Sequence, residues 1–437
     1  MTSSGHAFSI GDLRIGVATC ATQIEGGRRD TNWADWAALP GRIKDGSSPL
    51  RATDHWNRWR EDTELMSELG LQVYRMGIEW SRIEPTPGEF DTEALGHYRE
   101  EITAIRAAGI EPMVTLHHFT HPSWFEGIGG WTSEVAVETW LRFVRVLVEH
   151  LGDLVTDWCT INEPNVFAVG GWLAGHFPPG RRNDWAAIRR VLHTLARAHC
   201  RAYHLIHELQ PGAKVGFAHH LRPFEPLNPR NPAHRVLART NAHLFQGAIT
   251  DAFLGGRFTR VLGPQPEDVT PGRHYDWLGI NYYSRTAVSG LEDGTFPNSP
   301  VSDLDWEIHP RGLVEMARWL HDRYPGPIWV TENGTCDNTD SFRSRYLYDH
   351  LRAIAESGLP FERYYHWCFV DNWEWAEGEV PRFGIVALDD ETQERTVKDS
   401  GRFLASVIAD HGVTDEAYAA HVEPQHYRIA TDPRPNG

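Results

Sequence analysis

Residues 158–164 read WCTINEP, an apolar and β-branched run that stops on Glu163, directly in front of a proline. Such a run is typical of a buried strand, and the proline is expected to hold the glutamate extended. Residues 328–334, IWVTENG, repeat the pattern and stop on Glu332. Two strands far apart in the sequence are therefore predicted to end on a glutamate that stands beside an asparagine.

Similar buried runs alternate with amphipathic stretches along the whole chain. The clearest helix covers 133–151, where apolar residues recur at helical spacing and Gly152 supplies a stop. The strand-like runs lie near 15–19, 72–80, 112–119, 156–162, 214–220, 276–283, 327–332 and 364–370. The other helical stretches lie near 56–69, 92–108, 185–209, 232–254, 311–324, 341–357 and 396–410. This alternation, without a linker, favours an α/β fold over residues 1–437: a single (β/α)8 TIM barrel with long loops at the carboxyl ends of its strands.

Composition limits the classes of partner and the compartment. The chain has 437 residues, 42 basic against 59 acidic side chains and a net charge of −17, which argues against nucleic acid and anionic membranes. No apolar run reaches the length of a membrane span, and MTSSGHAFSIGDL lacks the basic and apolar regions of a signal peptide. Five cysteines without CxxC spacing are expected to be reduced thiols. A soluble cytoplasmic protein is therefore expected.

The carboxyl ends of the strands are where a barrel of this kind places its chemistry. The residues predicted there are Gln23, Glu25, Arg75, His117, His118, Asn162, Glu163, His219, His220, Asn281, Tyr283, Glu332, Trp367, Glu374 and Trp375. Amides and carboxylates can bond sugar hydroxyls, and indoles can cover the apolar face of a pyranose ring. Glycoside hydrolysis needs two carboxyl groups on opposite sides of one bond, which two strand ends of a rigid barrel can supply.

The chain resembles glycoside hydrolase family 1, the β-glucosidase and β-galactosidase family of retaining enzymes. The stretches that carry the resemblance, in the family's order, are ATCATQIEGG (18–27), YRMGIEWSRIEPTPGEFD (74–91), TLHHFTHP (115–122), TINEP (160–164), GINYYS (279–284), VTENG (330–334) and DNWEWAEG (371–378). The resemblance implies that Glu163 is the acid/base and Glu332 the nucleophile. It implies substrate contacts from Gln23, His118, Asn162, Asn281, Trp367, Glu374 and Trp375.

The implied reaction is removal of the terminal non-reducing β-D-glycosyl residue from a small-molecule β-glycoside through a covalent intermediate. Glu332 must then be ionised, with Arg75 and Tyr283 as its expected partners, and Glu163 must begin protonated. Asn162 would bond the sugar 2-hydroxyl. A glucoside is the expected substrate, with galactoside or fucoside open. No cofactor and no metal are expected, and association into a homo-oligomer is left open.

Other interpretations stay open beside this one. A non-catalytic carbohydrate-binding barrel would be expected to lose at least one glutamate, and both are present. The histidine groups HHFTH (117–121), HLIHE (204–208) and AHH (218–220) suggest a metal-dependent hydrolase, but HLIHE is neither HExxH nor HxxEH. A transglycosylase would differ only in the acceptor that reaches the covalent intermediate.

Departures from the family pattern lie on the aglycone side. Phe119 and Asn165 stand where many members have tryptophan, and Trp172 and Trp306 are the candidates for walls there. The resemblance also implies a non-proline cis peptide between Trp367 and Cys368. In DNWEWAEGEVPRFG (371–384), the serine, lysine and tyrosine of the family's 6-phosphoglycosidases are replaced by Glu374, Pro381 and Phe383, and Arg382 is expected to face a structural partner.

Overall fold

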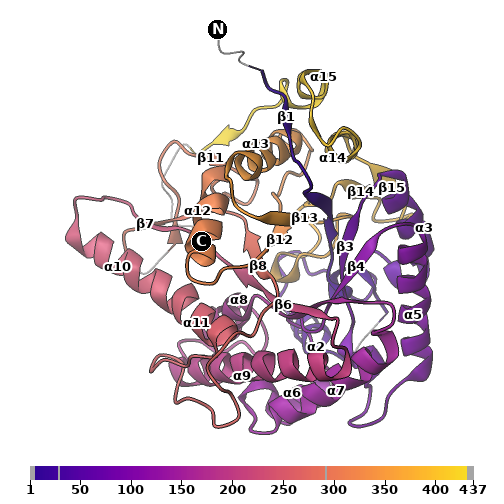
Figure 1. Cartoon of the computed structure of the whole chain (residues 1–437), viewed down its shortest axis with the longest axis vertical. Coiled ribbons are helices and arrows are strands. Elements are labelled where there is room, and N and C mark those ends of the chain that lie inside the picture. Colours follow the sequence, from indigo (N-terminus) through magenta and orange to yellow (C-terminus); the bar gives the residue numbers. More distant parts are fainter. Residues whose placement is uncertain (1–4, 28–29, 291–292, 431–437) are drawn as a thin grey trace.

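Eight parallel strands pair edge to edge into a closed barrel, in the order β12-β13-β2-β3-β4-β5-β6-β8 (Figure 1). The computed structural model describes residues 5–27, 30–290 and 293–430. The barrel strands are β2 (Arg14–Ala18), β3 (Val73–Gly77), β4 (Glu111–Thr115), β5 (Asp157–Asn162), β6 (Lys214–His220), β8 (Leu278–Tyr282), β12 (Ile328–Asn333) and β13 (Phe361–Trp367). Every residue of β3, β5, β8 and β12 is buried, as parallel strands covered on both sides require. The predicted (β/α)8 barrel is confirmed.

Helices of the outer layer cover the barrel between successive strands. They are α3 (His55–Glu68), α5 (Thr92–Ala107), α7 (Ala136–Leu151), α9 (Trp185–Leu209), α10 (Pro232–Ala242), α11 (Ala248–Gly255), α12 (Pro310–His321), α13 (Arg343–Glu356) and α14 (Asp399–Ala409). In α7 the predicted apolar stripe is the buried face, and the helix stops at Gly152 as expected. Among the described residues, no helix is both long enough and apolar enough to cross a membrane.

Several predicted elements differ from the structure in their bounds, and the strands expected near 72–80 and 112–119 end already at Gly77 and Thr115. The stretch 232–254, expected as one helix, is α10 and α11 joined by a π-helical turn at His243–Gly247. The last strand begins at Phe361 rather than at 364, because the charged pair Glu362 and Arg363 hides its start in the sequence. Arg363 is buried and bonds to Asp157 of β5, so its charge is neutralised inside the barrel rather than exposed.

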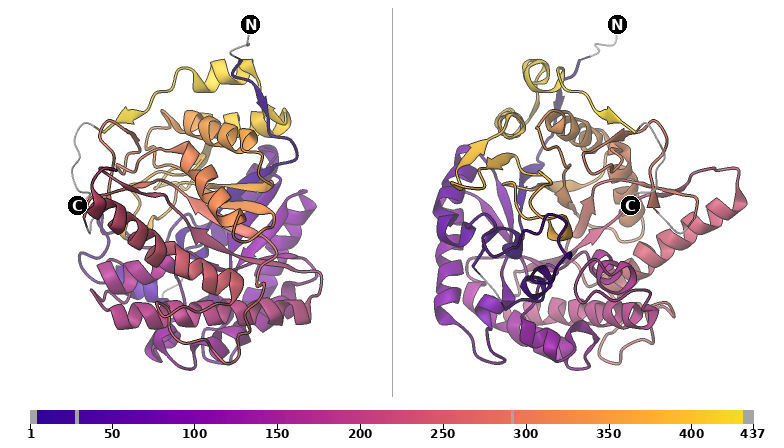
Figure 2. Two further views of the ribbon diagram at one scale, coloured as in Figure 1. Left: turned by 60° about the vertical axis from the view of Figure 1, so that its left-hand side comes forward. Right: turned by 180° about the vertical axis from the view of Figure 1, so that it is seen from behind.

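The loops and the segments near both ends of the described chain carry small elements of their own. The short strands are β1 (Phe8–Ser9), β7 (Phe224–Pro226), β9 (Thr286–Val288), β10 (Asp293–Gly294), β11 (Pro300–Val301), β14 (Val386–Leu388), β15 (Arg395–Val397), β16 (Gly412–Val413) and β17 (Arg428–Ile429). The short helices are α1 (Ala21–Ile24), α2 (Asn32–Ala37), α4 (Trp80–Ile83), α6 (Ser123–Gly127), α8 (Pro164–Ala168) and α15 (Asp415–Ala417). Figure 2 shows α10 projecting from the body of the molecule.

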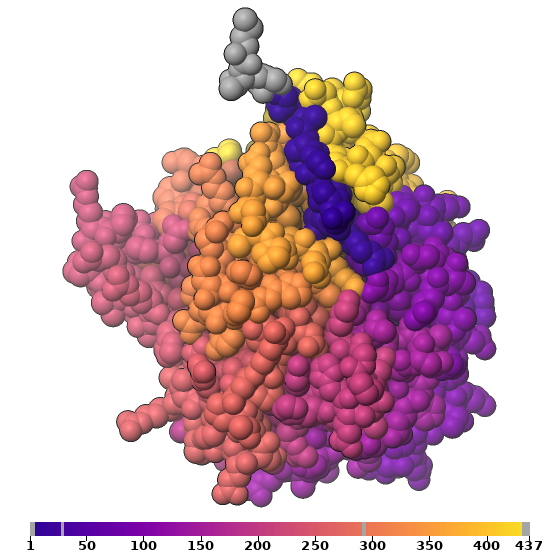
Figure 3. Space-filling model, in the orientation of Figure 1, coloured from indigo at the N-terminus to yellow at the C-terminus, as the bar shows by residue number. Residues whose placement is uncertain are grey.

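A strand near the N-terminus and one near the C-terminus meet on one side of the molecule. β1 pairs antiparallel with β16, and Figure 3 shows the N-terminal segment lying against the C-terminal one. Tyr348 of α13 donates a hydrogen bond to the backbone carbonyl of His6, which anchors the N-terminal segment to the outer layer. The N-terminal segment is thereby fixed to the outer layer, outside the barrel itself.

Candidate active site

Both strand-end glutamates follow an irregularity in the barrel ladder. The pairing of β5 with β6 is shifted between Cys159 and Asn162, and that of β12 with β8 is shifted between Val330 and Glu332. Such irregularities redirect the side chains that follow them, and they occur often beside active sites. The two strands therefore end alike because, in each, the shift in pairing register redirects the side chain of the glutamate that follows it.

Glu163 has a left-handed backbone with φ 42° and ψ 60°, which corrects the expectation that the proline would hold it extended. Helix α8 begins at Pro164, directly after the strand, so the chain must reverse direction within one residue. A left-handed conformation is costly for a residue with a side chain and is found where the surroundings enforce it, often at functional sites.

Arg75 of β3 lies fully buried at the centre of the site and joins three strand ends. One guanidinium nitrogen lies 2.6 Å from Glu332 Oε1, and another donates to Asn162 Oδ1 at 2.6 Å. Tyr283 donates its hydroxyl to the other oxygen of Glu332, Oε2, at 2.6 Å. Glu332 therefore has a cation and a hydroxyl donor, one on each carboxylate oxygen, as the sequence predicted.

Glu163 has a different set of neighbours. Asn281 Nδ2 donates to Glu163 Oε1 at 2.9 Å, and His220 Nδ1 lies 2.9 Å from the same oxygen. Asn281 Nδ2 also donates to Asn162 Oδ1 at 3.0 Å, while its own oxygen accepts from Thr331 at 2.6 Å. The amide of Asn281 is thus used within the protein, where it holds Glu163 and Asn162 in place.

The two glutamates are linked in their protonation. Burial raises the pKa of Glu332 to about 7, the Arg75 guanidinium opposes this rise, and the charge of Glu163 adds to it. Burial also acts to raise the pKa of Glu163, but His220, Asn281 and Arg75 together hold that pKa below its usual value. Because each carboxylate disfavours ionisation of the other, the two groups titrate as a pair, and a proton on one favours ionisation of the other.

Hydrogen bonds decide which carboxyl group keeps that proton. Both oxygens of Glu332 accept from fixed donors, whereas Asn281 and His220 both reach Oε1 of Glu163 and no described residue donates to its Oε2. A proton can bind to Glu163 Oε2 without displacing a donor, but on Glu332 it would displace one. A proton on Glu163 Oε2 therefore costs no hydrogen bond, although burial raises the pKa of Glu332 and the neighbours of Glu163 lower its pKa.

A polar and aromatic wall faces the two glutamates. Gln23 Nε2 donates to Glu374 Oε2 at 3.3 Å, and the rings of Trp367 and Trp375 each lie 5.8 Å from His118. Burial and the charge of Glu332 raise the pKa of Glu374 to about 8. The structure thus brings together the residues predicted to contact the substrate. The cis peptide predicted between Trp367 and Cys368 is confirmed.

Two buried polar atoms in this wall lack a partner among the described residues. Asn162 Nδ2 donates to His118 Nε2 at 2.8 Å, and burial lowers the pKa of His118 well below its usual value, so this ring is neutral with its proton on Nδ1. His118 Nδ1 and Gln23 Oε1 are both buried without a protein partner. Buried polar groups are normally hydrogen-bonded, so this donor and this acceptor are suited to ligand hydroxyls.

The candidates for the aglycone side are placed differently from one another. Trp306 is 38% exposed, and its ring lies 5.8 Å from that of Tyr283, at the open side of the nucleophile candidate. Trp172 is 3% exposed and packs on Phe167, so it offers little surface to a ligand. Asn165 is buried and donates to the backbone carbonyl of His220, which ties α8 to the end of β6.

Two of the strand-end residues, Glu25 and His219, serve the scaffold, and so does Arg382 in the loop after β13. Glu25 binds Arg82 at 2.6 Å and accepts from Tyr98 at 2.6 Å. His219 turns to the outer side of β6, where its Nε2 lies 3.1 Å from Thr250. Arg382 pairs with Asp390 at 2.9 Å, so it faces a structural partner as expected. His220 is the contact that sequence reasoning missed, and the only signal for it was its place beside His219 at the end of a strand.

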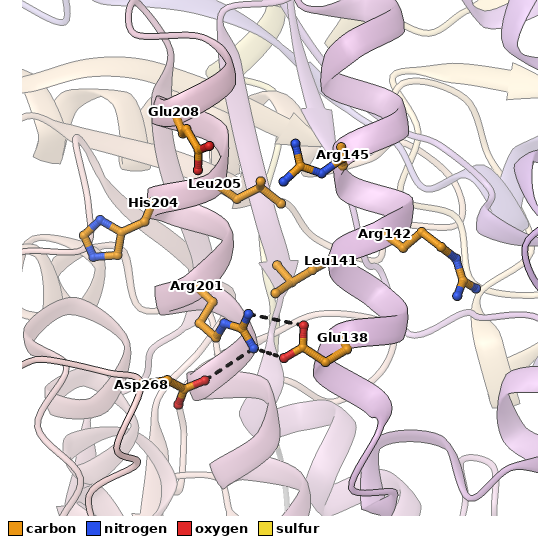
Figure 4. Close-up of a pocket in the computed structure, with 9 residues that line it drawn as sticks. All are labelled: Glu138, Leu141, Arg142, Arg145, Arg201, His204, Leu205, Glu208 and Asp268. Atoms are coloured by element: carbon orange, nitrogen blue, oxygen red, sulfur yellow. Dashed lines mark hydrogen bonds and ion pairs between the residues drawn. The ribbon is translucent and has the colours of Figure 1, made fainter.

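Two other features of the described residues lie away from this site. A groove of about 480 Å³ separates α7 from α9 on the outside of the barrel, and its Arg201 pairs with Glu138 and Asp268 (Figure 4). Glu225, His309 and Glu315 have potential metal-ligand atoms within 4.8 Å of one another. Arg285 lies 3.3 Å from Glu225, so a protein cation already neutralises part of that cluster.

Comparisons with known proteins identify the family of the chain. The model of glycosyl hydrolase family 1 matches residues 10–413. β-Glucosidase A of Thermotoga maritima is 34% identical over an alignment of 438 positions that covers 92% of this chain and 97% of that protein. The chloroplastic galactolipid galactosyltransferase of Arabidopsis thaliana is 32% identical over an alignment of 417 positions that covers 89% of this chain and 63% of that protein.

A solved structure shows the same fold with a ligand bound. The structure of the Thermotoga maritima β-glucosidase in complex with glucoimidazole matches with a TM-score of 0.85 and 31% identity, over 93% of this chain and 100% of that one. The match of the family model over most of the chain and the identity to these relatives establish the family. The chain belongs to glycosyl hydrolase family 1 and is a glycosyl hydrolase of the β-glucosidase type.

Proposed function

We propose that this enzyme removes the terminal non-reducing β-D-glycosyl residue of a small-molecule β-glycoside with retention, and that the preferred sugar is glucose. The observation that carries the proposal is the unequal setting of the two glutamates. Glu332 has a donor on each oxygen, one of them a cation, whereas Glu163 keeps one oxygen free for a proton. One group is suited to attack as an anion and the other to donate a proton.

The reaction follows from this setting in two steps. Glu332 attacks the anomeric carbon while Glu163 Oε2 gives its proton to the leaving oxygen, so the glycosidic bond breaks and a covalent glycosyl ester forms. The ester removes the negative charge of Glu332, which lowers the pKa of Glu163. Glu163 then takes a proton from water, which attacks the same carbon from the opposite face and releases the sugar with its original configuration.

The contacts to the sugar are proposed on the same geometry. The second N–H of Asn162 Nδ2 is directed to the 2-hydroxyl, a contact that strengthens as positive charge develops on the ring. Gln23, His118 and Glu374 would bind the remaining hydroxyls, with Trp367 and Trp375 along the ring. Trp306 would line the aglycone side. Asn281 is better placed as a positioning residue, because its amide already bonds within the protein.

Replacement of the nucleophile tests the assignment directly. We expect Glu332→Ala to lose nearly all turnover of p-nitrophenyl β-glucoside, and added azide to restore it with formation of the α-glycosyl azide. Azide can enter the space that the carboxylate leaves and attack from the same face. A β-glycosyl azide from this variant would exchange the roles of Glu332 and Glu163.

Transfer to an acceptor other than water is the second candidate, and the relative from Arabidopsis thaliana, named as a galactosyltransferase, favours it. Both activities share the covalent intermediate, so the ratio of free sugar to transfer product at increasing acceptor concentration separates them. We further propose that the whole chain forms one catalytic domain. Its five buried, unpaired cysteines suit a reducing compartment such as the cytoplasm.

A further inference from the structure

We infer that His220 is a positioning residue for the acid/base: its Nδ1–H occupies Glu163 Oε1 and so directs the catalytic proton to Oε2. This inference rests on the proposed roles of Glu163 and Glu332. His220 is the last residue of β6 and lies next to β5, whose end carries Glu163. The histidine and the glutamate therefore meet because two neighbouring strands of the barrel end side by side.

The contacts of His220 fix its ring. Nδ1 lies 2.9 Å from Glu163 Oε1, and the ring stands 6.0 Å from that of Tyr283 at an angle of 20°. Phe245 packs edge-on against its other side at 5.8 Å. The backbone carbonyl of His220 accepts from Asn165 Nδ2 at 2.8 Å. Ring and backbone are both held, so the direction of Nδ1 is set before substrate binds.

The number of hydrogen-bond donors at each carboxyl oxygen of Glu163 determines which oxygen can hold the catalytic proton. A carboxyl oxygen offers two lone pairs, and Oε1 of Glu163 meets two donors, His220 Nδ1–H and Asn281 Nδ2–H. A proton on Oε1 would have to displace one of them. On Oε2 it meets no described donor, so a hydrogen on His220 Nδ1 leaves Oε2 as the acid position.

Asn281 alone would not give the same result. With one donor on Oε1, that oxygen would keep a free lone pair, and the proton could settle on either oxygen of Glu163. With His220 as a second donor on Oε1, the proton is restricted to Oε2.

Other titratable groups also face Glu163. They are Arg75 from β3, Tyr283 after β8, Glu332 from β12 and Glu374 from the loop after β13.

Asparagine and glutamine provide a matched pair of substitutions at His220. The side-chain nitrogen of asparagine can stand where Nδ1 stands, whereas that of glutamine reaches the position of Nε2. We therefore compare His220→Asn, His220→Gln and His220→Phe, which keeps a ring without a donor. His219→Gln is the control, because His219 is the adjacent buried histidine and bonds away from the site, to Thr250.

The readout compares leaving groups. 2,4-Dinitrophenyl β-glucoside needs no acid assistance, whereas methyl β-glucoside does. We expect His220→Phe and His220→Gln to lower kcat/KM for the methyl glucoside at least about tenfold more than for the dinitrophenyl glucoside, since general-acid assistance is worth about 10²–10⁴-fold. We expect His220→Asn to restore the wild-type ratio. A purely structural role would reduce both substrates equally.

The pH profile gives a second readout. Loss of a donor to the Glu163 carboxylate should raise its pKa, so the basic limb of kcat/KM should move up by about one pH unit in His220→Phe and stay in place in His220→Asn. If His220→Phe does not fold, His220→Gln supplies the same comparison.

Three results would overturn the inference: an unchanged leaving-group ratio in His220→Phe and His220→Gln, full restoration by glutamine, or faster cleavage of the methyl glucoside without the ring. The last result would mean that Glu163 donates its proton to His220. None of the three touches the proposed function. That function fails instead if the wild-type enzyme does not cleave the dinitrophenyl glucoside with retention.

Discussion

Tyr282 and Tyr283 are neighbours in sequence at the end of β8, but their hydroxyl groups bind different partners. Tyr283 donates to Glu332 Oε2 at 2.6 Å, whereas Tyr282 donates to the backbone carbonyl of His309 at 2.7 Å, away from the site. The bond from Tyr283 lowers the pKa of Glu332 and so opposes the effect of burial. The Tyr283 hydroxyl therefore affects the pKa of Glu332, whereas the Tyr282 hydroxyl binds only the protein backbone.

We expect Tyr283→Phe to raise the pKa of Glu332. Because Glu332 must be ionised to attack, the acid limb of kcat/KM should move to higher pH, by about one unit for one lost bond to a charged group. Activity should therefore fall most at low pH. Tyr282→Phe is the control and should leave the limb in place. An acid limb unmoved by Tyr283→Phe would contradict the assignment of Glu332.

The main contacts of Glu332 could be predicted from the sequence. The prediction came from the family resemblance, because Arg75, Tyr283 and the two glutamates lie in motifs of that family. The contacts of Glu163 were predicted less well. Asn281 was predicted as a substrate contact, yet its amide is used by Glu163, Asn162 and Thr331. Which donor of an amide meets which oxygen depends on strand register, and a sequence does not show the register.

At the scale of elements, a buried histidine joins α3 to α5 and to β15. His55 Nδ1 lies 2.6 Å from Asp62, its Nε2 lies 2.8 Å from Glu101, and Arg395 binds the far side of Asp62 at 2.8 Å. Burial acts to lower the pKa of His55, but Glu101 and Asp62 outweigh it and raise that pKa to about 10. The histidine is therefore charged in the folded protein at neutral pH.

This raised pKa makes the stability of the helical layer depend on pH. The folded pKa of about 10 exceeds the ordinary value of 6.5, so the contribution is complete below pH 6.5 and disappears as pH rises through about 10. We expect His55→Gln to lower the free energy of unfolding by a few kcal/mol at pH 6 and by much less at pH 10. Urea denaturation at several pH values measures the difference.

His199→Gln provides the matched control for that series. Burial lowers the pKa of His199 to about 3, so this histidine is neutral in the folded protein and loses no proton between pH 7 and 10. The destabilisation by His199→Gln should stay constant over that range. A destabilisation by His55→Gln that is equally constant would show that His55 is neutral in the folded state.

The loop after β13 decides whether a phosphate can enter the site. Glu374, Pro381 and Phe383 stand at the positions of three donors in the phosphate-binding branch of the family, and Arg382 is paired with Asp390. Phe383 packs against the rings of Trp306 and Tyr283. The loop thus presents a carboxyl group and an aromatic ring, with its nearby cation already engaged.

We expect the enzyme to prefer p-nitrophenyl β-glucoside over its 6-phosphate by at least about a hundredfold in kcat/KM, roughly 2.7 kcal/mol. A phosphate dianion would meet none of those three donors, and it would repel Glu374 wherever that carboxyl group is ionised, that is, above its raised pKa of about 8. Equal values for the two substrates, or a preference for the phosphate, would mean that this loop binds phosphate by other donors.

Most element boundaries followed from apolar periodicity, but those with buried charge did not. The start of β13 was missed because Arg363 has the charge of a surface residue, although it is buried against Asp157. The π-helical turn between α10 and α11 lies inside one continuous helical pattern. Long-range ion pairs and local helix widening leave no periodic signal in a sequence.

At the scale of the whole molecule, the barrel keeps stability and chemistry at opposite ends. Arg363 lies at the amino ends of the strands, where it binds Asp157 of β5 at 2.5 Å, pairs with Glu111 of β4, and stacks on Trp329 of β12 at 3.9 Å. Arg75 is a second buried arginine of the barrel strands, and it binds Glu332 and Asn162 at the carboxyl ends. Both arginines join several strands, but of these two only Arg75 touches the groups that react.

We therefore expect Arg363→Met to lower the free energy of unfolding by about 3–5 kcal/mol, because it leaves a buried carboxylate unpaired. The kcat/KM of the folded enzyme should stay within about twofold, because residues at the amino ends of barrel strands serve stability. Arg75→Met should lower both quantities, since it also removes the cation beside Glu332. Arg352→Met, which breaks an exposed pair with Glu356 on α13, should change stability by less than about 1 kcal/mol. Urea denaturation and kcat/KM of all three variants decide the matter: a loss of activity in Arg363→Met as large as that in Arg75→Met would mean that the two ends of the barrel are coupled through its strands.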